Sequence, residues 1–253
     1  MNSSKENSTT VISQPYFFPW IGMFEQINFA DTYVHYDDVQ YSKGHFQDRV
    51  QIKTNDGSKW LTVPKKAVRL GQMINEIQLE DRKDWRKSQL EFLKQVYKKA
   101  PFCSETINLV EEVYSSNYNS LADISIASIE TVLDFFEMKN NTRILKSSDL
   151  NIEGKSTARV IAICKHVNSN KYITGMGALN YFDFELFEKE NIRVEFIEYA
   201  KTPYPQLFGE FNPYLSILDL IANTGKEGIN YFNSRTIYWQ EFLKTDIAKD
   251  YLN

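Results

Sequence analysis

The sequence contains few cysteines and no long apolar run. Only two cysteines occur among 253 residues, Cys103 and Cys164, and their spacing is not that of a metal-binding pair. Reduced thiols of this kind are typical of the cell interior, so a cytoplasmic location is expected. No stretch of about 18 apolar residues is present to span a membrane. Residues 1–10 are polar and lack the apolar segment of a signal peptide, so a disordered tail is expected there.

An excess of basic residues is also absent. The chain has 29 Lys and Arg against 33 Asp and Glu, which gives a formal net charge of -4. This balance argues against a broad nucleic-acid-binding surface, although it allows a local basic site for a phosphorylated small molecule. Hydrophobic residues make up 42% of the chain and charged residues 25%, as in globular proteins. Disorder of the whole chain is therefore excluded.

The first sixty residues predict a βαβ unit followed by a β-hairpin. Apolar residues predict strands at Val11–Gln14 and Tyr33–Tyr36, with a helix at Ile21–Phe29 between them. The turn residues of 55–58 join two further β-type segments, 50–53 and 60–64. A parallel βαβ unit places the loops that follow its two strands at the same edge of a sheet.

The rest of the chain predicts a helical insertion and then a return to alternating strands and helices. A further β-type segment is expected at 74–79, and three helices are expected within about 84–138. Ser120 and Asp123 resemble a capping box at the start of the third of these helices. Strands are predicted at 142–145, 171–174 and 193–199, with a helix after each of the first two. A last helix is expected to begin at Asn212 and Pro213 and to end before Gly225. The fold class is therefore α/β, with a Rossmann-like, mostly parallel sheet, an inserted β-hairpin and a helical subdomain. One domain is expected to cover residues 11–253.

Polar residues follow four of these predicted strands. They occur in segments 14–20, 37–43, 147–149 and 174–181. Ligands of open parallel sheets bind outside the carboxyl ends of the strands, so these segments are expected to form one site. The candidate substrate-binding residues in and near them are Gln14, Tyr16, Gln40, Lys43, Arg49, Ser147, Ser148, Thr174, Gly175, Asn180 and Tyr181.

The candidate catalytic residues are His35, Asp37 and Asp38. Adjacent carboxylates can bind Mg²⁺, accept a proton or hold sugar hydroxyls, whereas the alternative is a turn with a helix cap. Neighbours in a strand point to opposite faces, so one Asp is expected to face the ligand and the other to cap a turn. His35 is a candidate base or, alternatively, a hydrogen-bonded core residue. No metal ligands are assigned.

Two further features suggest anion binding. Lys43, Arg49 and Lys53 form a basic cluster that can bind phosphate or carboxylate, or instead pair with nearby Asp residues. The small-residue segment 174–178 lies between a predicted strand and a predicted helix, where backbone amides can hold an anion. It lacks the GK[ST] of a Walker loop, and tight turns also use glycine for steric reasons alone.

These motifs, in this order, resemble the WbqC-like family over roughly residues 11–230. Two departures are visible, because many members have His where this chain has Ser13 and Asn where it has Asp48. The segments that carry the resemblance are Gln14–Phe24, Tyr36–Tyr41, Asp48–Val50, Trp60–Pro64, Ile74–Ile77, Tyr97–Phe102, Ser147–Leu150, Tyr172–Gly175, Tyr204–Leu207 and Phe211–Asp219.

The resemblance implies a role in surface-polysaccharide biosynthesis. The family is associated with the modification of unusual sugars, which implies a transferase that moves an acyl or aminoacyl group from a donor to a nucleotide-linked amino sugar. The expected partner is therefore a nucleotide-sugar or sugar phosphate. Two alternatives remain open: a metal-dependent hydrolase or lyase that uses Asp37 and His35, and a non-catalytic sugar-binding protein of the same pathway.

Overall fold

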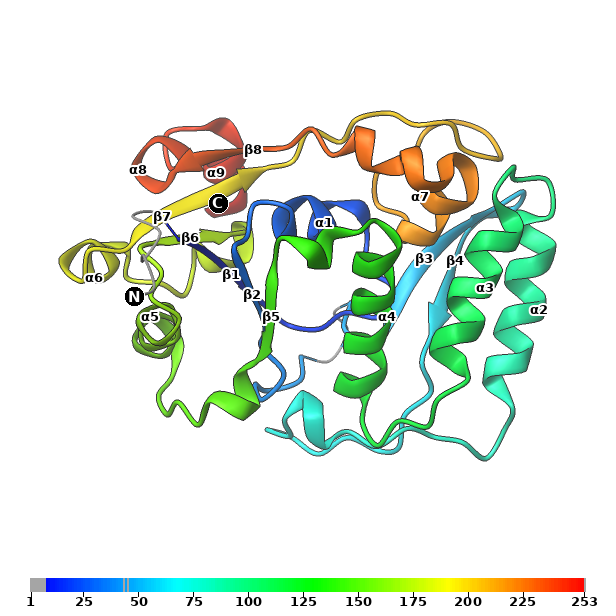
Figure 1. Ribbon diagram of the computed structural model, residues 1–253, viewed down its shortest axis with the longest axis horizontal. Helices are drawn as coiled ribbons and strands as arrows, with labels where there is room; N and C mark the ends of the chain where they lie inside the picture. Colours follow the sequence, from blue (N-terminus) through cyan, green and yellow to red (C-terminus); the bar gives the residue numbers. More distant parts are fainter. Residues whose placement is uncertain (1–7, 43, 45, 253) are drawn as a thin grey trace.

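A computed structural model describes residues 8–42, 44 and 46–252 of the protein (Figure 1). The strands are β1 (Thr9–Ser13), β2 (Thr32–His35), β3 (Arg49–Thr54), β4 (Gly57–Thr62), β5 (Arg143–Lys146), β6 (Lys171–Thr174), β7 (Arg193–Glu198) and β8 (Arg235–Tyr238). The helices are α1 (Ile21–Ile27), α2 (Trp85–Tyr97), α3 (Cys103–Tyr114), α4 (Leu121–Phe135), α5 (Ser156–His166), α6 (Phe184–Lys189), α7 (Ile217–Thr224), α8 (Trp239–Phe242) and α9 (Asp246–Leu252).

Six strands form one sheet in the order β5-β2-β1-β6-β7-β8. All neighbouring pairs are parallel except β7 and β8. The chain builds outward from β1 to β2 and β5, and then crosses to the other side of β1 to form β6. The order of the strands therefore reverses between β1 and β6, and this is where ligands bind in open α/β sheets.

Alternating side chains bury both faces of this sheet. Val11 and Tyr33 lie in the hydrophobic cluster on the face of α1 and α4, whereas Ile12 and Val34 lie in the cluster on the face of α5 and α6. This alternation follows from the period of two residues in a strand. The α/β fold class predicted from the sequence is confirmed. No helix in the described part of the chain has the length and apolarity needed to cross a bilayer.

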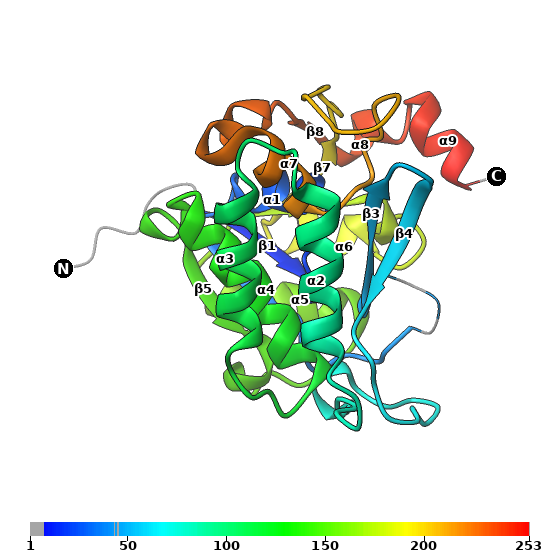
Figure 2. The same cartoon turned by 90° about the vertical axis from the view of Figure 1, so that its right-hand side faces the viewer.

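The hairpin and the helices of the inserted segment stand to one side of the sheet. Figure 2 shows β3 and β4 as a separate ribbon beside α2 and α3. Ser120 and Asp123 form a reciprocal capping box that begins α4, as the sequence predicts. The insertion thus supplies one helix that covers the sheet, α4, and two that extend away from it. β1 begins at Thr9, so the expected tail is shorter, and residues 1–7 lie outside the described residues.

Three local predictions are wrong. Segment 74–79 is not a strand but contains a short 3-10 helix, η1 (Ile74–Glu76), because its backbone pairs only at isolated bridges. The last large helix begins after Ser216, whose hydroxyl accepts a hydrogen bond from the Leu218 amide, and not at Asn212. After β6 the chain forms only the 3-10 turn η4 (Met176–Ala178), and α6 starts much later. The expected anion cradle at a helix N-terminus is therefore absent from this loop.

Candidate functional site

The predicted polar segments lie at the carboxyl edge of the sheet, as expected. Gln14 follows β1, Asp37 follows β2, Ser147 follows β5 and Gly175 follows β6. These four strands are neighbours in the sheet and run parallel. Their following loops therefore share one edge, with the loops of β1 and β6 on either side of the point where the strand order reverses.

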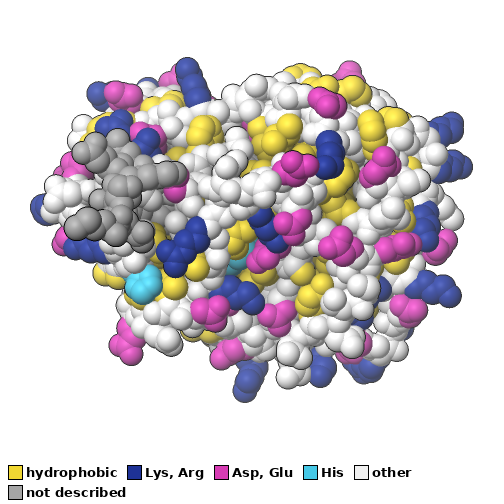
Figure 3. Space-filling view, in the orientation of Figure 1, with side chains coloured by type: hydrophobic (Ala, Val, Ile, Leu, Met, Phe, Trp, Pro, Cys, Tyr) yellow, Lys and Arg dark blue, Asp and Glu magenta, His cyan; other side chains and the backbone are white. Residues whose placement is uncertain are grey.

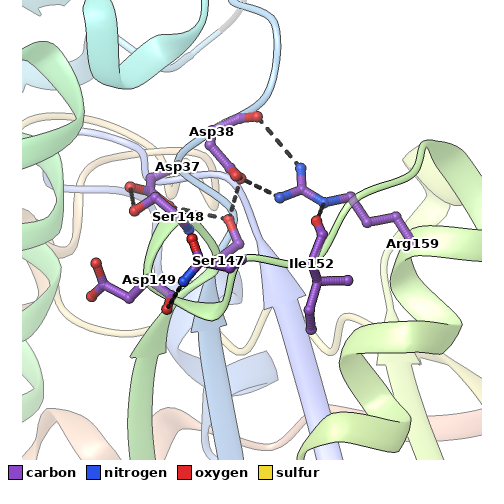
Figure 4. Close-up of polar contacts among 8 residues, drawn as sticks. Asp37, Asp38, Ser147, Ser148, Asp149, Ile152 and Arg159 are labelled. Carbon is purple, nitrogen blue, oxygen red and sulfur yellow. Dashed lines mark hydrogen bonds and ion pairs between the residues drawn. The ribbon is translucent and has the colours of Figure 1, made fainter.

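Asp37 joins the loops that follow β2 and β5. Its side chain is buried and accepts hydrogen bonds from the Ser147 hydroxyl at 3.1 Å and from the Ser148 amide and hydroxyl at 3.1 and 2.7 Å (Figure 4). The Ser147 hydroxyl has one proton to share between Asp37 and Asp38, but both Ser148 donors serve Asp37, so this buried carboxylate is well satisfied. Asp37 thus has the geometry of a turn cap that fixes one loop against the other.

The Asp38 side chain, unlike the buried side chain of Asp37, remains partly exposed. Its carboxylate accepts from the Ser147 hydroxyl at 2.5 Å and pairs with Arg159 at 2.5 Å, and 24% of its side chain is accessible to solvent. Burial raises the pKa of Asp38, but hydrogen bonds from Arg159 and Ser147 outweigh this effect and lower the pKa overall. Asp38 is therefore ionised near pH 7, and of the two adjacent Asp side chains it is the one that a ligand can reach.

Arg159 is a site residue that the sequence interpretation missed. It lies on α5, donates through Nε to the Ile152 carbonyl at 3.0 Å and stacks over the Tyr36 ring at 5.1 Å. The sequence did contain a signal for this residue. Arg159 precedes the apolar Ile163 by four positions, which places both on the sheet-facing side of the helix. A buried arginine on such a face requires an anionic partner, and here that partner is Asp38.

His35 is a fully buried residue at the end of β2. Its Nε2 lies 3.5 Å from a carboxylate oxygen of Glu130 on α4, and neither ring nitrogen makes a standard hydrogen bond. Burial lowers the pKa of His35, although Glu130 acts in the opposite direction. His35 is therefore neutral near pH 7 and does not open onto the edge where Asp38 lies.

The loop that follows β1 is rigidly positioned. The Gln14 side-chain carbonyl accepts from the buried Gln47 amide at 2.6 Å. Phe18 has a positive φ of 38° and no exposed surface. Its amide donates to the Ser128 hydroxyl at 2.9 Å, and its carbonyl accepts from the Ser216 hydroxyl at 2.8 Å. A strained backbone held from two helices is typical of a functional loop, where it fixes side chains in advance of binding.

Three tyrosine side chains lie near the carboxyl ends of β1 and β6. The Tyr33 hydroxyl is 3.0 Å from the Ser13 hydroxyl. Burial raises the pKa of Tyr16. Burial also raises the pKa values of Tyr33 and Tyr199, and their electrostatic interaction with Tyr16 raises them further. A Cβ atom at Gly175 would lie 3.5 Å from the Tyr199 hydroxyl. In the described part of the chain, the Tyr16 and Tyr199 hydroxyls have no hydrogen-bond partner, so both are available to a ligand.

Arg49 does not form the ion pair that was considered as an alternative. Asp48 pairs with Lys65, whereas Arg49 donates to the Gly44 carbonyl at 2.9 Å and stacks over Trp60 at 4.6 Å. Its Nε is buried without a hydrogen-bond partner. Among the described residues, the Arg49 guanidinium has no carboxylate partner. Lys43, predicted beside it, lies outside the described residues.

The other predicted binding residues do not converge on this site to the same degree. The Thr174 side chain is buried and accepts from the Tyr172 hydroxyl at 3.2 Å. Gln40 and Asn180 are exposed, and Tyr181 is 73% exposed. The Tyr181 backbone donates to the Ala178 carbonyl and accepts from the Ser156 hydroxyl. Within residues 8–42, 44 and 46–252, no group of three or more His, Cys, Asp or Glu side chains is arranged to hold a metal ion.

Comparison with known proteins identifies relatives of the chain. Residues 14–231 match the WbqC-like protein family, a segment that includes every loop of the carboxyl edge described above. A protein of Mycobacterium tuberculosis (strain ATCC 25618 / H37Rv), named "Uncharacterized protein Rv1507c", is 32% identical over 223 residues, or 87% of this chain and 95% of that protein. No solved structure matches the chain. Because the matched segment covers well over half of the chain, the chain belongs to the WbqC-like family.

Proposed function

We propose that this protein is a cytoplasmic group transferase of surface-polysaccharide biosynthesis that acts on a nucleotide-linked amino sugar. The observation that carries the proposal is that the Arg49 guanidinium has no carboxylate partner among the described residues. Its neighbour Asp48 is neutralised by Lys65, so the guanidinium fork remains available to a diphosphate. Arg49 is two residues from Gln47, which bonds to Gln14 at the carboxyl edge. A phosphate-binding cation thus adjoins the region where a sugar would lie.

Neutral polar groups at the same edge suit the sugar. The hydroxyls of Tyr16 and Tyr199 each offer one donor and two acceptor positions, and the Gln14 side chain is half-buried. Groups of this kind bind hydroxyls without the high cost of burying unpaired charge. The rigid loop after β1 would position Tyr16 and Gln14 before the sugar binds, which limits the entropy lost on binding.

In the proposed reaction, the sugar amine attacks the carbonyl carbon of an acyl or aminoacyl donor. A C–N bond forms, the bond to the donor's leaving group breaks, and the amine proton passes to the leaving group. Asp38 would orient the amine through its accessible, ionised carboxylate. Because Arg159 and Ser147 lower its pKa, Asp38 is a better hydrogen-bond acceptor for an ammonium or amine than a general base. Asp37 would position Asp38 through Ser147.

Titration calorimetry with UDP-glucosamine and free glucosamine tests the binding step. Two charge-assisted bonds of about 1.5–3 kcal/mol each favour the nucleotide-sugar by about 100-fold or more. Arg49→Ala should remove much of this preference, and Arg49→Lys should restore only part of it because the planar fork is lost. Arg82→Ala, at an exposed surface ion pair, is the matched control and should leave both affinities unchanged. Equal affinity for the two ligands would refute the phosphate contact.

Mass spectrometry of the sugar after incubation with acyl and aminoacyl donors tests the reaction. A transferase adds the mass of the donated group to the amino sugar. A loss of mass without any donor would instead indicate the hydrolase or lyase. Binding that leaves the sugar unchanged with every donor class would indicate a non-catalytic sugar-binding protein.

A further inference from the structure

A cavity outside the candidate site described above opens beside α4. It has a volume of about 410 Å³, within the range of small-molecule sites. Its wall includes Glu130 of α4, Lys146 at the end of β5, and the side chains of Asn117 and Asn119 from the loop before α4. Figure 3 shows acidic and basic side chains interspersed over this face of the molecule.

Opposite charges line this cavity without neutralising each other. Glu130 pairs with Lys139 at 3.1 Å through one oxygen, and its other oxygen faces His35. Lys146 forms no ion pair with Glu130 or with any other carboxylate among the described residues. Both residues nevertheless lie close enough to His35 to influence it, Glu130 raising its pKa and Lys146 lowering it. Glu130 and Lys146 therefore line one cavity without pairing with each other, and Glu130 keeps its ion pair with Lys139.

A buried histidine lies behind Glu130, outside the cavity lining. His35 is 0% exposed, and both of its ring nitrogens lack a hydrogen bond of standard geometry. The polar neighbour of His35 on the cavity side is the Glu130 carboxylate, at 3.5 Å. A ligand that moved Glu130 slightly toward His35 would shorten the 3.5 Å contact to an ordinary hydrogen bond.

We infer that this cavity binds a zwitterionic α-amino acid, with its ammonium on Glu130 and its carboxylate on Lys146. The Asn117 and Asn119 amides supply further donors and acceptors for the same two groups. Ile126 and Ala127 provide apolar surface for the amino acid's side chain. A contact between Glu130 and His35, together with the Lys139 ammonium, lowers the pKa of Glu130 to about 2 against the effect of burial, so the carboxylate stays charged. This inference goes beyond the nucleotide-sugar proposal and does not depend on it.

Calorimetry on the full chain with three ligands of one shape tests the inference, without any nucleotide present. L-leucine has both charges, isocaproate lacks the ammonium, and isoamylamine lacks the carboxylate. L-leucine should bind at least about tenfold more tightly than either analogue, because each charge-assisted contact is worth about that factor. This comparison uses wild-type protein only, so no failure of folding can obscure it. Leucine that binds no better than the analogues, or does not bind, would overturn the inference.

Variants then assign the two contacts. Lys146→Met should reduce the affinity for leucine to that for isoamylamine and leave isoamylamine unchanged. Glu130→Gln should reduce it to that for isocaproate. Lys165→Met removes an exposed lysine paired with Glu190 on α6's side of the molecule and should change nothing. Leucine binding that survives both Lys146→Met and Glu130→Gln would place the amino acid elsewhere and refute this site.

Discussion

Asp219 on α7 is expected to make the stability of the protein depend strongly on pH. The side chain is 1% exposed and accepts a hydrogen bond from the Tyr204 hydroxyl at 3.1 Å. Burial raises its pKa from 3.8 to about 7, although Tyr204 and Lys53 act in the opposite direction. The neighbouring Tyr97 hydroxyl is buried without a hydrogen-bond partner. The substitution Asp219→Asn removes the ionisable group and keeps an acceptor for Tyr204.

The sign and size of the effect follow from linkage. The pKa of Asp219 is higher in the folded state, so its stabilising contribution is complete below about pH 4 and is lost as the pH rises to about 7. A pKa of about 7 in place of 3.8 corresponds to a loss of up to about 4 kcal/mol, at about 1.4 kcal/mol for each tenfold change. Asp219→Asn should therefore be more stable than the wild type at pH 8 by up to that amount. The two proteins should converge near pH 4.

Urea denaturation of both proteins at several pH values between 4 and 8.5 measures this difference. Other titrating groups affect both proteins equally and cancel in the comparison. Ser58→Ala, at an exposed position, removes no ionisable group; it is the control and should give a difference that does not change with pH. If the difference between the wild type and Asp219→Asn were equally independent of pH, the reasoning from burial would be refuted.

Four other substitutions have expected outcomes, each measurable by chemical denaturation. Asp37→Asn should cost about 1–3 kcal/mol, because an amide nitrogen would face donors that now have an acceptor. Asp38→Asn should cost at least as much and also weaken ligand binding, because it leaves the buried Arg159 guanidinium without its anionic partner; an unchanged midpoint for Asp38→Asn would contradict its role as that partner. Arg159→Lys should cost about 1–2 kcal/mol, since one ammonium cannot replace the guanidinium fork, and an unchanged midpoint would show that the fork is dispensable. Gly225→Ala should cost more than about 1 kcal/mol, because φ is 58° and the new Cβ would lie 2.6 Å from the Phe102 ring, and a neutral effect would mean that the ring moves freely.

The elements with strong periodicity were predictable from the sequence, and those determined by tertiary contacts were not. β6 and the cap of α4 match because short apolar runs and a Ser–Asp capping box are local signals. Segment 74–79 has apolar residues at Ile74, Ile77 and Leu79, which favoured a strand, but within it only Leu79 forms a bridge, with Lys65. β8 was missed because it is a short edge strand whose pairing with β7 is visible only in the folded chain.

The same distinction holds for the candidate site. Strand ends placed Asp37 and Ser147 at one edge, and the structure brings them within 3.1 Å of each other. Arg159 was missed because its partner, Asp38, is 121 residues away in sequence, and a local sequence pattern cannot predict a contact between residues so far apart. The partners of Arg49 were also beyond prediction, since Lys65 satisfies Asp48 across the hairpin region and leaves Arg49 free.

The position of β1 at the centre of the sheet has a consequence for how the chain folds as it is synthesised. β1 is made first and finds β2 almost at once, but its other neighbour, β6, begins only at Lys171. Until about two-thirds of the chain has left the ribosome, one edge of β1 has no strand to pair with. Such an edge is prone to pair with other chains, and contacts this distant in sequence form slowly. Slowing translation while β6 is still inside the ribosome should therefore increase aggregation, whereas slowing it after β6 has emerged should not.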